Sequence, residues 1–216
     1  MAGTLGHALL VCATLALPHI AHAEPASDAT RKANAAALAE LPMADRRDFD
    51  FASRGFVATL KDPLIRDAAG KVVWDTTALA FAKGEAPATV NPSLWRHAQV
   101  LGKAGLFKVT DRIWQVRGFD VANITFVRGD SGWIVIDPLT ATETAAAAYA
   151  LISEKIARLP VSAMVYTHSH VDHFGGAGAF GAVLAKDAPI VAPQGFTRAA
   201  VGENVIAGPA MGRRAG

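Results

Sequence analysis

Residues able to bind a metal are concentrated in one short segment, which reads His168-Ser169-His170-Val171-Asp172-His173. Three of the seven histidines in the 216-residue chain fall within these six positions, together with one aspartate. Neutral imidazole and carboxylate groups suit zinc, and a cluster without cysteine fits a hydrolytic site better than a structural one. The segment therefore predicts a metal site with His168, His170, Asp172 and His173 as candidate ligands.

The spacing within this segment would allow it to bind two metals. His168 and His170 alternate by two, so they can point to one side of an extended segment, whereas Asp172 and His173 begin the next turn and can face a second position. Paired metals lower the pKa of bound water towards ~7 and hold the attacking and leaving oxygens. We therefore expect hydrolysis with a metal-bound hydroxide as nucleophile. The alternative is that the histidines merely cap a helix or fill a loop.

The surrounding elements predict a mixed sheet that places the segment at its edge. A buried strand over 161–166 leads into the segment, and a glycine-opened helix over 174–187 follows it. Upstream, β-branched and aromatic runs at 106–116, 123–129 and 132–138 predict three or four antiparallel strands. A helix over 142–159, a strand over 189–193 and a helix over 194–204 complete an α/β pattern. Such folds place their sites at strand ends.

The first part of the chain predicts an exported protein. Residues 1–23 combine an apolar run over 8–17 with Pro18 and the cleavage pattern Ala21-His22-Ala23, as in a secretory signal peptide, although the positively charged residues usual at its start are missing. We therefore expect a periplasmic or secreted product. The alternative is a buried N-terminal helix, since this run is too short to span a bilayer.

The residues before the expected strands are predicted to be helical or loop-like. Residues 24–59 are expected to form an N-terminal arm with a helix over 28–41. Residues 60–89 read as a loop, and Asn91 is expected to cap a helix that runs to Leu101.

Composition excludes several partner classes. The chain is 51% hydrophobic with a net charge of +2, which indicates a globular domain with a substantial core. Lysines and arginines never occur in runs longer than two, so neither nucleic acid nor an anionic membrane is an expected partner. We therefore expect a small-molecule substrate and no stable membrane span.

The motif and its flanking segments resemble a known family. Thr167 to His173, followed by Gly175-Gly176, resembles the metallo-β-lactamase superfamily, whose fold is an αβ/βα sandwich. Residues 91–148, 167–176 and 203–215 are similar to zinc-dependent alkyl sulfatases, which hydrolyse linear primary alkyl sulfates such as dodecyl sulfate to alcohol and inorganic sulfate. The resemblance implies one zinc on His168 and His170, and a second zinc on Asp172 and His173.

The resemblance also suggests roles for residues outside the motif. It implies that Asp137 supports the metal-binding loop, although an aspartate before Pro138 could simply start a turn. Asn123 and Arg128 lie in a stretch typical of the family but receive no role, and no substrate-binding residue is identified. His97 is interpreted as a surface residue of its helix.

The resemblance implies that the site needs residues beyond Gly216. The family completes its two-zinc site with two glutamates and a histidine far downstream of the motif. After His173 this chain has no further histidine, and its only acids are Asp187 and Glu203. Glu203 is expected on a helix, where it does not suit that task. Residues 60–216 are therefore expected to form the front half of the sandwich, without the family's dimerisation and C-terminal domains.

Two alternatives to an alkyl sulfatase remain. The motif would also serve another hydrolase of the superfamily, such as a lactonase or thioesterase, and the chain could be an inactive truncated fragment of a homodimeric enzyme.

Overall fold

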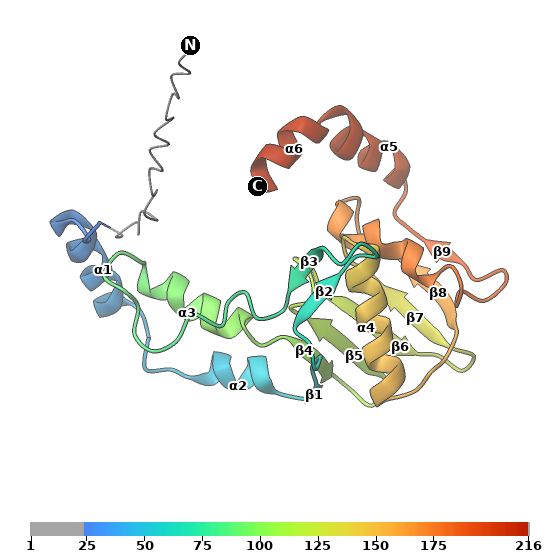
Figure 1. Ribbon diagram of the computed structural model, residues 1–216, viewed down its shortest axis with the longest axis horizontal. Coiled ribbons are helices and arrows are strands. Elements are labelled where there is room, and N and C mark those ends of the chain that lie inside the picture. Colours follow the sequence, from blue (N-terminus) through green and yellow to red (C-terminus); the bar gives the residue numbers. More distant parts are fainter. Residues whose placement is uncertain (1–23, 216) are drawn as a thin grey trace, which may run out of the picture.

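The computed structural model describes residues 24–215, and the expected signal peptide at 1–23 lies outside this range. A seven-stranded sheet in the order β1-β4-β5-β6-β7-β8-β9 forms the body of the molecule (Figure 1). Its strands are β1 Phe56–Ala58, β4 Gly105–Lys108, β5 Ile113–Arg117, β6 Ile124–Arg128, β7 Trp133–Ile136, β8 Val161–Val165 and β9 Ile190–Val191. No helix within the described range is long and apolar enough to cross a membrane.

The sheet is mixed, as the sequence predicts. Neighbouring strands from β1 to β7 pair antiparallel, whereas β7, β8 and β9 pair parallel. The parallel step from β7 to β8 is made by α4, Thr142–Lys155. Since β1 pairs with β4, the sheet begins before residue 60, where the sequence placed the end of the arm.

The segment expected to be a loop over 60–89 contains a separate hairpin, formed by β2 Leu64–Arg66 and β3 Val72–Asp75. Its turn is stabilised by Asp67, whose Oδ1 accepts from the backbone N–H groups of Ala69 and Lys71, both at 2.9 Å. The Trp74 indole donates to the carbonyl of Gly118 at 2.9 Å, which ties the hairpin to the end of β5. Strands this short have too little alternation to be recognised from sequence.

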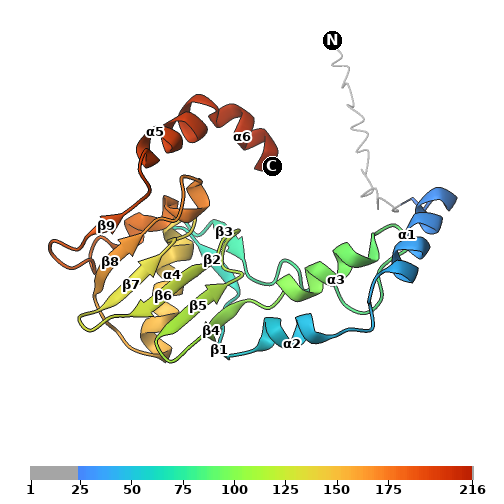
Figure 2. The ribbon, with the colours of Figure 1, turned by 180° about the vertical axis from the view of Figure 1, so that it is seen from behind.

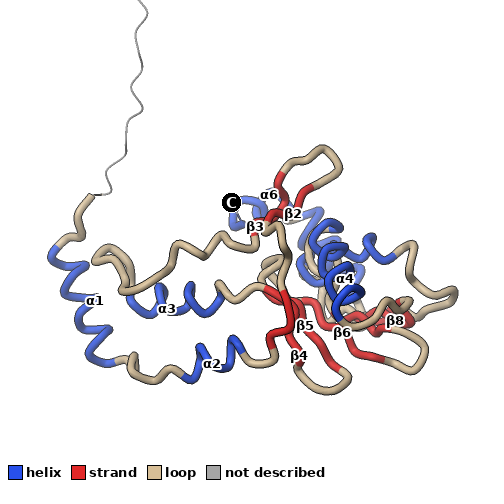
Figure 3. Tube along the Cα trace, turned by 60° about the horizontal axis from the view of Figure 1, so that its bottom comes forward, coloured by secondary structure: helices blue, strands red, loops and turns tan. Residues whose placement is uncertain are grey.

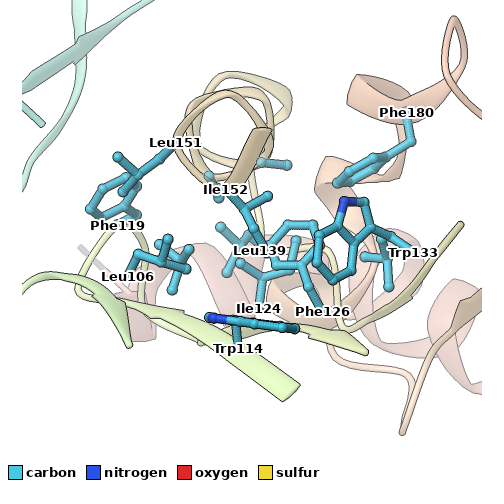
Figure 4. Close-up of a cluster of buried hydrophobic side chains, with 14 of the residues drawn as sticks. Leu106, Trp114, Phe119, Ile124, Phe126, Trp133, Leu139, Leu151, Ile152 and Phe180 are labelled. Carbon is cyan, nitrogen blue, oxygen red and sulfur yellow. The ribbon is translucent and has the colours of Figure 1, made fainter. Parts of the chain in front are cut away.

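The hydrophobic core lies between the sheet and α4. Alternate residues of the strands point to this side, including Trp114, Phe126 and Trp133, which are at most 6% exposed. The α4 residues Leu151 and Ile152 pack over this aromatic layer (Figure 4).

The opposite face of the sheet is also partly apolar but only half-buried. Its side chains include Ile113, Val127, Ile134, Ile136 and Val165, and the strands lie in front of α4 when seen from this side (Figure 2).

Three helices form an arm beside the sheet (Figure 3): α1 Asp28–Glu40, α2 Arg47–Ser53 and α3 Pro92–Leu101. The expected cap of α3 is present, because Asn91 Oδ1 accepts from the N–H of Ser93 at 2.9 Å. Arg96 of α3 connects the arm internally: its guanidinium binds Asp48 of α2 at 2.6 Å and the carbonyl of Met43 at 2.7 Å.

Two helices differ from the prediction. The helix expected over 142–159 ends at Lys155, and its N-cap position is Ala141. The helix expected over 174–187 is replaced by a short 3₁₀ segment, Gly175–Phe180 (η2), which follows another at Val171–His173 (η1). Glycine is a poor helix former, and these glycines serve close packing instead: a Cβ on Gly176 would lie 2.2 Å from the carbonyl oxygen of Pro138.

The C-terminal region is helical for longer than expected. After β9 come α5 Phe196–Val201, a π-helical turn at Gly202–Ile206 (η3) and α6 Gly208–Ala215, which together arch away from the sheet (Figure 1).

Candidate metal centre

The predicted metal-binding residues lie at the carboxyl ends of two adjacent parallel strands. Asp137 directly follows β7, and the segment from Thr167 to His173 follows β8. Ile136 is paired with Val165, and the N–H of Asp137 donates to the Val165 carbonyl at 3.0 Å. The parallel register therefore brings Asp137 next to a segment 30 residues further along the chain.

Asp137 holds the segment through three hydrogen bonds. Its Oδ1 accepts from the Thr167 N–H at 2.8 Å, and its Oδ2 accepts from the Thr167 hydroxyl at 2.7 Å and lies 2.9 Å from His173 Nδ1. Asp137 has a positive φ of 54° and is 9% exposed. A left-handed backbone is unusual outside glycine and is best tolerated by aspartate and asparagine. The residue is thus held in a strained turn that directs its carboxylate into the segment.

The three histidine rings gather at one place. The ring centres of His168 and His173 are 4.0 Å apart, and those of His168 and His170 are 4.6 Å apart. His173 Nε2 lies 3.2 Å from Asp172 Oδ2. Two ligands bound to one tetrahedral zinc at about 2.0–2.1 Å stand about 3.3 Å apart, so Asp172 and His173 are spaced like two ligands of one metal.

The donor chemistry of the segment therefore fits a metal, although the side chains are not closed around one. Over residues 24–215, no three histidine, cysteine or acidic side chains form a set that could hold a metal ion as they are positioned. The assignment of His168 and His170 to one zinc, and of Asp172 and His173 to another, stays a prediction.

Glu203 is brought into the site by the fold. It lies on the π-helical turn η3, and its Oε1 is 3.2 Å from His170 Nε2. From the sequence alone, Glu203 is not an expected metal ligand. Its contact with His170 depends on how the chain returns after β9, which no local pattern reveals. The hydrogen bond from the Ala207 N–H to the Gly202 carbonyl, at 3.0 Å, closes the π turn that carries Glu203.

An aromatic group connects this returning segment to the motif. Tyr166, at the end of β8, lies 5.4 Å from Phe196 of α5 and 6.1 Å from Phe174, measured between ring centres. Burial raises the pKa of the Tyr166 hydroxyl above its usual value. This packing places α5, and with it Glu203, next to the histidines.

Asp120, in the loop between β5 and β6, supports the site from behind. This buried carboxylate accepts from the Thr140 and Thr144 hydroxyls, both at 2.6 Å, and from the Thr140 N–H at 3.1 Å. It thereby connects the residues that lead into α4 with Thr144 in the first turn of that helix. This role could not be predicted from a local pattern, because Asp120 lies 20 residues before Thr140.

A cleft of about 690 Å³ adjoins the site. His170, Asp172 and Glu203 line one part of it, and Val73, Trp74 and Val121 contribute apolar surface. Such a cleft has both a polar end and an apolar wall.

The remaining residues singled out in the sequence lie outside this arrangement. His97 is exposed on α3, as predicted. Arg128 is exposed at the end of β6 farthest from the site, and Asn123 is exposed in the loop before β6.

Comparisons with known proteins agree with this architecture. The family model described as the metallo-beta-lactamase superfamily matches residues 117–203. The chain is 48% identical to a linear primary-alkylsulfatase from Pseudomonas sp., over 89% of this chain and 29% of that protein. It is 46% identical to an (R)-specific secondary-alkylsulfatase from Pseudomonas sp., over 96% of this chain and 32% of that protein.

A solved structure shows the same fold. The stereoselective inverting sec-alkylsulfatase from Pseudomonas sp. superposes with a TM-score of 0.80 at 47% identity, over 88% of this chain and 31% of that chain. The chain thus has a mixed α/β fold of the metallo-β-lactamase type, and it spans about 30% of the length of the relatives that it matches.

Proposed function

Because the chain is an alkylsulfatase homologue of the metallo-β-lactamase superfamily, we propose that it supplies the metal-binding segment of an enzyme that hydrolyses linear primary alkyl sulfates. Water and the ester would yield an alcohol and inorganic sulfate. One observation carries the proposal: Asp137 anchors a segment in which three imidazoles and a carboxylate converge at a sheet edge. Primary and secondary alkylsulfatases are similar to the chain to nearly the same degree, so the preference for a primary ester is part of the proposal.

The metal in this proposal is zinc. His168 and His170 would hold one ion, and Asp172 and His173 the other, and zinc supplies Lewis acidity for hydrolysis when bound. Each zinc needs about three protein ligands in a catalytic site, so four residues do not suffice for two ions. We propose that the remaining ligands come from a further part of an exported, homodimeric enzyme.

The other residues of the chain would orient the ligands and the substrate. Asp137 would hold His173 through Nδ1, which leaves Nε2 free to face the metal. The apolar wall formed by Val73, Trp74 and Val121 would bind the alkyl chain, and the polar end of the cleft would place the sulfate group beside His170 and Asp172. The half-buried second face of the sheet suits contact with further protein, because an apolar surface gains free energy when it is covered.

A chimera tests the proposed function. Residues 24–215 would replace the aligned segment of the linear primary-alkylsulfatase, and release of sulfate from dodecyl sulfate would be measured in the presence of zinc. We expect turnover by the chimera, loss of turnover when His170→Ala is introduced, and no change with His97→Ala, the exposed control on α3. Full activity of the His170→Ala chimera would contradict the ligand assignment. Hydrolysis of a lactone or a thioester without sulfate release would favour another hydrolase of the superfamily.

A further inference from the structure

The hydroxyl of Thr167 contacts two residues of the candidate metal centre at once. Its Oγ1 lies 2.7 Å from Asp137 Oδ2 and 3.0 Å from Nδ1 of His168. The backbone N–H of Thr167 already donates to the other oxygen of Asp137 at 2.8 Å. The backbone bond by itself would be enough to hold Thr167 beside Asp137. The additional contact made by the hydroxyl therefore needs a separate explanation.

The single hydroxyl proton determines how these groups are bonded. An ionised carboxylate only accepts hydrogen bonds, so the Thr167 proton points to Asp137. The hydroxyl oxygen then faces His168 Nδ1 with a lone pair, and the 3.0 Å contact is a hydrogen bond only when Nδ1 carries the ring proton. A neutral imidazole protonated at Nδ1 has its free lone pair at Nε2.

We propose that Thr167 is a positioning residue that selects the Nδ1-protonated tautomer of His168, so that this histidine presents Nε2 to a metal. The inference rests on the proposed metal centre. It explains why one oxygen, Asp137 Oδ2, serves both neighbouring rings: it binds His173 Nδ1 directly and reaches His168 Nδ1 through the Thr167 hydroxyl. One carboxylate thereby favours the Nδ1-protonated tautomer of both rings, whose centres are 4.0 Å apart.

Two substitutions separate the hydroxyl from the shape of the side chain. Thr167→Val keeps the branched shape and removes the hydroxyl, whereas Thr167→Ser keeps the hydroxyl. Thr125→Val is the matched control, because the Thr125 hydroxyl on β6 contacts the Gln115 side chain at 3.2 Å on a different part of the sheet. Thr167→Ala provides a second hydroxyl-free variant if the valine variant does not fold.

The first measurement concerns the metal-free full chain, labelled with ¹⁵N-histidine at pH 8, where free imidazole is neutral. Nitrogen chemical shifts distinguish a protonated ring nitrogen from a bare one, and the signals missing from a His168→Gln variant identify His168. We expect His168 to be protonated at Nδ1 in the wild type, in Thr167→Ser and in Thr125→Val, and to lose this preference in Thr167→Val. A wild-type His168 protonated at Nε2, or an unchanged Thr167→Val spectrum, would overturn the inference.

The second measurement is zinc affinity, determined by competition with a chelator. Loss of a residue that orients a metal ligand costs roughly 10-fold to 100-fold in affinity. We expect a loss of about that size in Thr167→Val and little change in Thr167→Ser and Thr125→Val. If the wild type binds zinc and Thr167→Val binds it equally well, the inference fails while the proposed function stands. If the wild type binds no zinc, this chain does not hold the metal without the further ligands proposed above, and the tautomer measurement alone decides the role of Thr167.

Discussion

Asp137 influences both metal binding and the backbone conformation of the site. Different substitutions at this position should separate the two effects. Asp137→Ala removes the acceptor for His173 Nδ1 and for both donors of Thr167. We expect zinc affinity to fall roughly 10-fold to 100-fold, which corresponds to about 1.4–2.7 kcal/mol. The Thr167 donors lie at an exposed residue, so water can replace part of what they lose. The reduction in affinity should therefore come from His173 directly and from His168 through the Thr167 hydroxyl.

The backbone effect follows from the φ of 54° at this position. A left-handed conformation costs an ordinary L-residue about 1–2 kcal/mol, a penalty that glycine avoids. Asp137→Gly should therefore lower the free energy of unfolding less than Asp137→Ala does. The difference between the two variants should be about 1 kcal/mol at most, because glycine also adds entropy to the unfolded chain. Both variants lack the carboxylate, so both should lose zinc affinity to the same extent.

The measurements are chelator competition for zinc and urea unfolding of the metal-free chain, with Asp137→Asn as the control that keeps one side-chain oxygen and tolerates a positive φ. Asparagine should retain more zinc affinity than alanine or glycine. The reasoning is refuted if Asp137→Ala binds zinc within twofold of the wild type, or if glycine and alanine differ in zinc affinity as much as in stability.

Three further predictions concern packing, a buried hydrogen-bond network and export. Gly176→Ala should destabilise the chain by roughly 2–3 kcal/mol in urea unfolding, since its Cβ would meet the Pro138 carbonyl oxygen at 2.2 Å, whereas Gly178→Ala, with its nearest neighbour at 3.5 Å, should be tolerated; equal stability of the two variants would contradict the packing. Asp120→Ala should cost about 2–3 kcal/mol, because it removes the buried acceptor of the Thr140 and Thr144 hydroxyls; unfolding within about 0.5 kcal/mol of the wild type would show that the network is unimportant. Expression in a bacterial host should give a product that begins at Glu24, and N-terminal sequencing that finds Met1 or Ala2 would contradict the export signal.

The features that could be predicted are those that short stretches of sequence encode. The motif at 168–173 combines residue type and spacing, and the apolar run before it marks a strand, so its place at a sheet edge follows from local pattern. Asn91 was recognised as a cap because it precedes a proline at the first turn of α3.

The features that could not be predicted depend on contacts between distant segments. Asp120 binds Thr140 and Thr144 across a loop, and Glu203 approaches His170 from a segment whose α5 packs on Tyr166. The sequence after His173 predicts an α-helix, since nothing in it reveals that the Pro138 carbonyl lies against Gly176.

The parallel step from β7 to β8 has a consequence for the order of folding. The strands from β4 to β7 form a meander with short connections, so their pairing closes small loops. The bond between Asp137 and His173 spans 36 residues and requires that α4 has already crossed over the sheet. Closing the longer loop costs more chain entropy, and contacts between distant residues form slowly. We therefore expect the meander to fold first and the Asp137 cluster to assemble late, so that zinc would slow unfolding more than it speeds folding.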